Sequence, residues 1–127
     1  MERPDVEARK KKERQLFELE DDYRLGKKFF EQVQEETYSD YLELSRFIDQ
    51  EEDLRLELLR RNSDLSLGGA SFVRDLTGHR LEAREVYQAR SRSLEQIEDD
   101  YDRSFKRQSN QLEDEIERLG KTNDDNY

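Results

Sequence analysis

The sequence contains no cysteine and no tryptophan, and only one proline and five glycines among its 127 residues. Without cysteine, the chain can form neither a disulfide nor a thiolate metal site. No apolar run approaches the roughly 18–20 residues that a membrane-spanning helix needs. The segment Met1–Asp5 lacks the apolar core of a signal peptide. We therefore expect a cytoplasmic protein with no membrane span.

Apolar residues are also scarce, at 31 % of the chain, against roughly 45–50 % in an ordinary globular domain. Charged residues make up 44 % of the chain, and the formal net charge is −10. A thick globular core is therefore not expected. The negative charge repels nucleic-acid backbones and anionic membranes, so we expect no nucleic-acid partner.

The few helix-breaking residues are unevenly spaced along the chain. Pro4 stands near the start, and the first turn of a helix tolerates proline. No proline follows, and glycine is absent between Gly26 and Gly68 and again between Gly78 and Gly120. These stretches consist mainly of Glu, Arg, Leu, Gln and Lys, which favour helices. The sequence thus predicts two helices longer than the usual 8–20 residues.

Apolar residues in both stretches recur in steps of three and four, the spacing of a coiled coil, and form two seams. The first seam consists of Leu16, Leu19, Tyr23, Gly26, Phe30, Val33, Thr37, Tyr41, Leu44, Ile48, Leu54 and Leu58. The second consists of Leu76, Arg80, Ala83, Tyr87, Arg90, Leu94, Ile97, Tyr101, Phe105, Gln108, Leu112, Ile116 and Leu119. Each seam contains two consecutive steps of four, which predict local unwinding of a left-handed supercoil.

We predict an all-α fold, a long antiparallel coiled-coil-like helical hairpin that forms one domain over residues 1–120. Its arms would span about 4–62 and 71–119, joined by a turn at about 63–70. Gly120 would end the second arm, before a disordered tail at 121–127. A break of the first arm at Gly26 stays open. The competing architecture is a three- or four-helix bundle, with breaks near Gly26 or at Tyr38-Ser39-Asp40.

The sequence offers little catalytic chemistry. His79 is the only histidine, and Leu76 stands where a Glu-x-x-His metal motif needs its glutamate. Gly68 and Gly69 are not followed by Lys-Ser/Thr, so they do not make a phosphate-binding loop. Adjacent carboxylates on a helix point in different directions, so the acidic triplets do not converge on a metal ion. These triplets are Glu20-Asp21-Asp22, Glu51-Glu52-Asp53 and Glu98-Asp99-Asp100. We expect no enzymatic activity, no cofactor, no metal site and no small-molecule ligand.

The apolar stripe is wider than a two-helix contact requires, and it is rich in aromatic residues. Because two helices alone bury little area, we expect either a helical protein partner or self-association. The candidate partner-binding residues are Tyr23, Phe30, Val33, Tyr41, Leu44, Ile48, Leu67, Phe72, Tyr87, Leu94, Ile97, Tyr101 and Phe105. The uncharged segment 65–73 has two interpretations: it folds over the ends of its own helices, or it is an exposed patch for a partner.

This small acidic hairpin with a glycine turn, Leu67-Gly68-Gly69, resembles the WXG-type proteins of bacterial type VII secretion. More particularly, it resembles the small helical partners encoded with LXG-domain toxins. The family's Trp-x-Gly turn and its Tyr-x-x-x-Asp/Glu export tail are absent, since Phe105 stands four residues after Tyr101. The resemblance implies a secretion chaperone or targeting factor that packs on the helical domain of a toxin. It leaves open whether the protein is exported together with the toxin. The alternative is a homo-oligomeric coiled-coil scaffold of a phage or cell-surface assembly.

Overall fold

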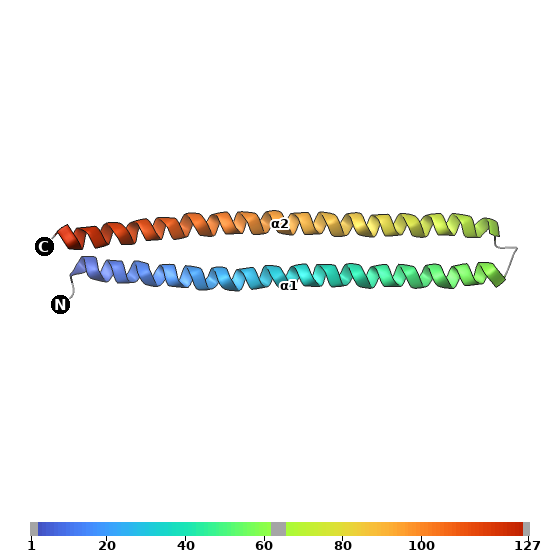
Figure 1. Ribbon diagram of the computed structural model, residues 1–127, viewed down its shortest axis with the longest axis horizontal. Coiled ribbons are helices and arrows are strands. Elements are labelled where there is room, and N and C mark those ends of the chain that lie inside the picture. The colour runs from blue at the N-terminus through green and yellow to red at the C-terminus, as the bar shows by residue number, and fades with distance from the viewer. Residues whose placement is uncertain (1–2, 62–65, 126–127) are drawn as a thin grey trace. The chain divides into compact units, whose positions relative to one another are not determined.

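The computed structural model describes residues 3–61 and 66–125 of the chain. Helix α1 spans Pro4–Arg61 and helix α2 spans Ser66–Asp125 (Figure 1). This part of the chain contains no strand. The two helices pack against each other in opposite directions, because Lys12 pairs with Glu115 and Arg80 pairs with Asp49. The predicted all-α helical hairpin is therefore confirmed.

The ends of α1 follow the rules for helix termini. Pro4 is the first helical residue, and the carbonyl of Arg3 accepts hydrogen bonds from the amides of Val6 and Glu7 at 3.0 and 3.2 Å. The first turn is acidic, and the last turn carries Arg60 and Arg61. Both placements complement the helix dipole and stabilise the two ends.

Helix α2 is longer at both ends than the sequence predicts. It begins at Ser66 rather than near residue 71, so 66–70 of the predicted turn are helical, and 63–65 lie outside the described residues. It also continues through Gly120 to Asp125, so the predicted disorder is wrong for 121–125, while 126–127 lie outside the described residues. A glycine costs a helix only about 1 kcal/mol relative to alanine, so it need not end one. The guanidinium of Arg9 lies against Gly120, 3.2 Å from the place of a Cβ.

Helix α1 is continuous through Gly26, so the break left open at this position does not occur. It also passes through residues 38–40 without interruption, which removes the basis for the competing three- or four-helix architecture. Gly26 has another use, because the ring of Tyr101 lies over it. A Cβ built at Gly26 would be 2.6 Å from Cζ of Tyr101, so only glycine leaves room for this ring.

The contacts between α1 and α2 divide into two units. Unit 1 combines Met1–Glu31 with Glu95–Tyr127, coloured blue and orange to red in Figure 1. Unit 2 is Gln32–Leu94, coloured from cyan through green to yellow. Each unit contains one segment of α1 and one segment of α2.

Neither unit has a thick core. Of the described residues, only Ile48 and Leu76, both in unit 2, are buried hydrophobic side chains, with 6 % and 7 % of their surface exposed. In unit 1 the described buried residue is Ser109. Tyr23, Phe30, Tyr101 and Phe105 are half-buried there, whereas Phe17 and Phe29 are exposed. Neither helix, over its described residues, is apolar enough to cross a membrane.

Candidate functional site

Unit 1 uses its aromatic residues to join its own two helices. Tyr23 of α1 stacks on Phe105 of α2 with 3.9 Å between ring centroids, and on Tyr101 with 5.4 Å. Phe30 of α1 also packs on Tyr101, with 5.4 Å between the ring centroids. These predicted partner-binding residues therefore already have partners within the chain.

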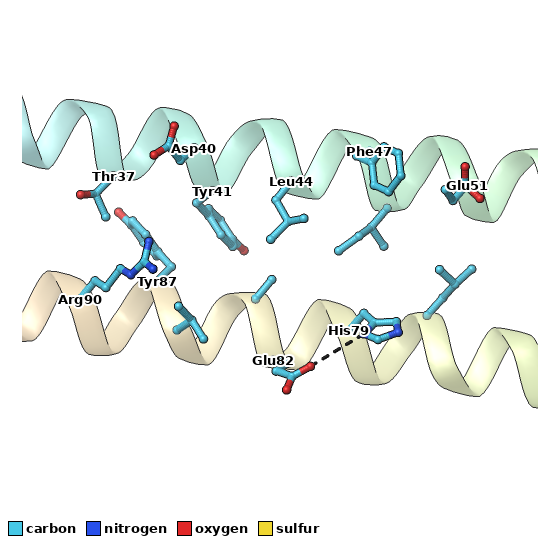
Figure 2. A pocket seen from close by; sticks show the side chains of 14 residues that line it. Thr37, Asp40, Tyr41, Leu44, Phe47, Glu51, His79, Glu82, Tyr87 and Arg90 are labelled. Atoms are coloured by element: carbon cyan, nitrogen blue, oxygen red, sulfur yellow. Dashed lines mark ion pairs between the residues drawn. The ribbon is translucent and has the colours of Figure 1, made fainter.

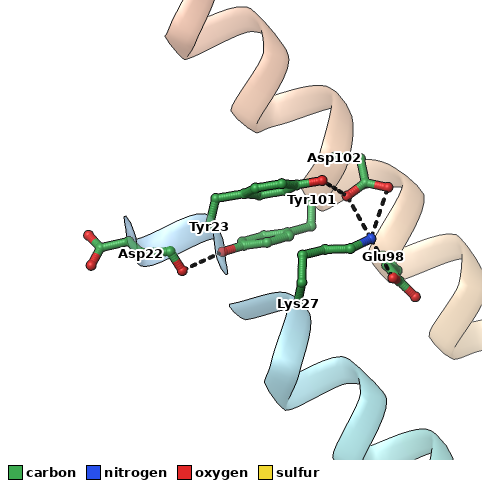
Figure 3. Close-up of polar contacts among 6 residues, drawn as sticks. All are labelled: Asp22, Tyr23, Lys27, Glu98, Tyr101 and Asp102. Carbon is green, nitrogen blue, oxygen red and sulfur yellow. Dashed lines mark hydrogen bonds and ion pairs between the residues drawn. The ribbon is translucent and has the colours of Figure 1, made fainter. Parts of the chain in front are cut away.

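A polar cluster lies beside this stack (Figure 3). The Lys27 ammonium lies 2.5 Å from Oε1 of Glu98 and 3.0 Å from Oδ1 of Asp102. The Tyr23 hydroxyl donates to Oδ1 of Asp102 at 2.6 Å, and the Tyr101 hydroxyl donates to the carbonyl of Asp22 at 3.2 Å. Every one of these contacts joins α1 to α2, so the cluster fixes how the helices of unit 1 align.

The cluster shifts the protonation equilibria of its members. The hydrogen bond from Tyr23, followed by that from Lys27, holds the pKa of Asp102 below its usual range. The same bond to Asp102 raises the pKa of Tyr23, and the bond to Glu98 raises that of Lys27. All three shifts favour the paired protonation states at neutral pH, so the cluster stabilises unit 1 there.

We expect Asp102→Asn to lower the free energy of unfolding by about 1 kcal/mol at pH 7, a figure limited by solvent screening of this partly exposed pair. Because the folded pKa of Asp102 lies below the unfolded value of about 3.9, its contribution is present above that pH and lost as pH falls through the folded pKa. The difference between wild type and Asp102→Asn should therefore shrink towards pH 2–3. Urea unfolding at pH 7, 5 and 3 measures it.

The matched control for this prediction is Asp99→Asn, since Asp99 is exposed on the same helix. Subtracting wild type from each variant removes the general effect of protonating a chain with a net charge of −10. A difference for Asp102→Asn that stays constant from pH 7 to pH 3 would contradict the role assigned to the cluster.

Unit 2 contains an apolar groove of about 490 Å³ between its two helices (Figure 2). The residues that line the groove are Thr37, Asp40, Tyr41, Leu44, Phe47, Ile48, Glu51, Leu76, His79, Glu82, Ala83, Val86, Tyr87 and Arg90. Tyr41 and Tyr87 stack across the helices with 4.6 Å between ring centroids. With the buried Ile48 and Leu76, these two rings form the floor of the groove.

The walls of the groove are apolar and open to solvent. Leu44 and Phe47 of α1 have 46 % and 59 % of their surface exposed, and Val86 of α2 is also exposed. Figure 2 shows Leu44 pointing from α1 towards α2. The groove therefore presents side chains that two helices alone leave uncovered.

The exposed wall of α1 continues as a stripe along one side of the helix. Its members, Leu44, Phe47, Glu51, Leu54 and Leu58, follow one another in steps of three and four, which places them on one face. All four apolar members are exposed. We call these five residues the α1 stripe. This spacing is typical of a helix face that packs against another helix.

The α1 stripe corrects the end of the first predicted seam. The sequence places Leu54 and Leu58 between the two arms, but both are exposed. The half-buried positions of α1 after Ile48 are Glu51, which is the polar member of the α1 stripe, Glu52 and Leu59. Polar residues suit this part of α1 because the guanidinium of Arg80 pairs with the carboxylates of Glu52 and Asp49. Its nitrogen lies 2.6 Å from Oδ1 of Asp49.

The second seam needs correction as well, since its polar members Arg80, Arg90 and Gln108 are exposed and Ser109 is buried in place of Gln108. Ile97 is exposed, and Glu98 occupies the inward position because its carboxylate pairs with Lys27. The inward steps from Leu94 to Glu98, Tyr101 and Phe105 are four, three and four. Because Ser109 is the next inward position, the two consecutive steps of four lie at Tyr101, Phe105 and Ser109 rather than at Ile97, Tyr101 and Phe105. Val33, Thr37 and Tyr41 of the first seam are all half-buried.

The structure divides the predicted partner-binding residues into three groups. The buried or half-buried ones are Tyr23, Phe30, Val33, Tyr41, Ile48, Tyr87, Leu94, Tyr101 and Phe105. Leu44 and Ile97 are exposed, and the side chains of Leu67 and Phe72 lie outside what the structure describes. The list of candidate partner-binding residues omitted Phe47, Leu54, Leu58 and Val86, which are exposed. Leu54 and Leu58 belong to the predicted first seam, whereas Phe47 and Val86 each stand next to a seam position in the sequence.

Other chemistry is sparse in the part of the chain that the structure describes. His79 lies at the rim of the groove, 3.8 Å from a carboxylate oxygen of Glu82, and both side chains are exposed. No group of three or more His, Asp or Glu side chains is arranged to hold a metal ion among the described residues. The groove is therefore the feature with the strongest functional signal.

Comparison with protein-family models, with curated proteins and with solved structures found no match for this chain.

Proposed function

We propose that the protein is a non-enzymatic helix-binding protein, in which unit 2 supplies two helices of a bundle and another protein supplies the remainder. The observation that supports this proposal is the open groove, whose floor is buried and whose walls are exposed apolar side chains. Covering apolar surface stabilises a complex by roughly 25 cal/mol per Å² removed from water. An amphipathic helix is the element that fits between two packed helices, since its own apolar stripe has the same spacing.

In the finer form of the proposal, the protein is a chaperone or targeting factor for a toxin of type VII secretion. It binds the toxin's helical domain in the cytoplasm and either remains there or leaves with it. The resemblance to the small helical partners of LXG-domain toxins supports this form, and the groove is compatible with a helical client.

Co-expression tests this function. The full chain is produced with the helical domain of an LXG-type toxin encoded beside its gene, and the tagged toxin domain is purified. We expect the two proteins to co-purify in a defined ratio, and we expect slower amide hydrogen exchange in residues 37–51 and 76–90 of the complex. The Phe47→Ser variant should be lost from the complex, while Phe29→Ser, which changes an equally exposed phenylalanine of unit 1, should be retained.

The homo-oligomeric scaffold makes the opposite prediction. Sedimentation equilibrium of the isolated chain at micromolar concentration would then give a defined dimer or trimer. A chain that stays monomeric and joins a toxin domain supports the binding function. A stable homo-oligomer that binds none of the toxin domains tested would favour the scaffold instead.

A further inference from the structure

The groove of unit 2 has a charge pattern as well as an apolar surface. Its lining includes the carboxylates of Asp40, Glu51 and Glu82, against one guanidinium, that of Arg90. His79, the remaining titratable group with nitrogen, lies beside Glu82 and is charged only when protonated. At neutral pH the lining is therefore acidic.

The acidic character extends along the outer side of each wall. On α1, Glu36, Asp40 and Glu43 precede Phe47 in steps of four, three and four, so the three carboxylates share its side of the helix. All four residues are exposed. Any helix seated against Phe47 would place its own flanking side chains near these carboxylates.

The opposite wall repeats the arrangement on α2. Asp75, His79 and Glu82 precede Val86, again in steps of four, three and four, and all of them are exposed. The apolar groove therefore lies between two lines of mainly acidic side chains. Opposite charges at the positions that flank an apolar seam determine which helices pair in coiled coils.

We propose that the groove of unit 2 selects an amphipathic helix whose apolar stripe is flanked by lysine or arginine. The inference rests on the proposed helix-binding function and names the chemistry of its partner. A second copy of this chain fits the groove less well, because each copy has a net charge of −10 and would bring acidic groove walls together.

Two synthetic helical peptides test the inference. Both carry the same leucines at the apolar positions, and they differ only in having lysine or glutamate at the flanking positions. Binding of each labelled peptide to the full chain is followed by fluorescence anisotropy at 50 and 300 mM NaCl. We expect the lysine peptide to bind more tightly by about tenfold or more at low salt, with the preference reduced at high salt.

Three variants assign the binding to the groove. Phe47→Ser leaves the net charge unchanged and should abolish binding, which distinguishes the groove from general attraction between a basic peptide and an acidic chain. Phe29→Ser is the matched control, because Phe29 has 62 % of its surface exposed in unit 1 and should leave binding unchanged. The double variant Asp40→Asn/Glu82→Gln should keep binding but lose most of the preference for lysine.

The outcomes separate the inference from the function on which it rests. Equal binding of the two peptides would overturn the charge selection and leave helix binding intact. Binding that survives Phe47→Ser, or no binding at all, would overturn the groove as the site, while the co-expression experiment judges the function independently. A dimer in sedimentation that Phe47→Ser converts to a monomer would show a second copy as the occupant and overturn the inference.

Discussion

Replacing Ile48 with alanine is expected to lower the free energy of unfolding of unit 2 by about 2–4 kcal/mol. Ile48 has only 6 % of its surface exposed, and Leu76 is the other described hydrophobic side chain that is buried. Removing atoms from so thin a core leaves a gap that few neighbours can fill. Because a domain is typically stable by only about 5–15 kcal/mol, the loss is a large part of the total.

Urea unfolding followed by circular dichroism measures this loss, and amide hydrogen exchange assigns it to unit 2. The matched control is Leu44→Ala, because Leu44 lies four residues earlier on the same helix and has 46 % of its surface exposed. We expect Leu44→Ala to cost less than about 1 kcal/mol, as is usual for surface changes. Equal losses for the two variants would contradict the assignment of Ile48 to the floor and Leu44 to the wall of the groove.

The same two variants should separate stability from binding. Leu44 contributes to the exposed wall, so Leu44→Ala should weaken the lysine peptide's binding while the hairpin stays folded. Ile48 contributes to the packing between α1 and α2, so its loss should destabilise the free protein first. This division follows from the difference in burial, since Ile48 is buried between the helices and Leu44 is exposed.

The helices themselves were predictable from the sequence, because long stretches of good helix formers contain no proline and few glycines. Their ends were less predictable. The sequence predicts a turn at Gly68 and Gly69 and a helix end at Gly120, yet all three lie within α2. A single glycine costs too little to decide where a helix stops, and no described glycine adopts a positive φ.

The two faces of α1 explain why the site was only partly predictable. The sequence places Leu44 and Ile48 on one seam, but the structure puts the first on an exposed wall and the second on the floor. When a helix has two adjacent lines of apolar residues, steps of three and four can be traced along either line. The spacing alone therefore does not say which line packs against the other helix. Arg80 pairs with Glu52 and Asp49 between the helices, and an apolar pattern contains no sign of such a contact.

Gly26→Ala is expected to destabilise unit 1 by about 1–2 kcal/mol, although alanine is intrinsically the better helix former by about 1 kcal/mol. The new Cβ would collide with the hydroxyl and ring of Tyr101. Moving this ring would disturb its stacking on Tyr23 and its hydrogen bond to the carbonyl of Asp22. The close approach of Tyr101 therefore outweighs the gain in helix propensity.

Two comparisons make this prediction specific. Gly78→Ala should stabilise the protein by about 1 kcal/mol, because no atom lies within 4 Å of its built Cβ. In a Tyr101→Ala background, Gly26→Ala should change sign and become stabilising by a similar amount. The resulting double-mutant cycle, measured by urea unfolding, should give a coupling of about 2–3 kcal/mol. If Gly26→Ala and Gly78→Ala were equally stabilising, Tyr101 would not pack against Gly26, and the register of α1 against α2 in unit 1 would have to differ.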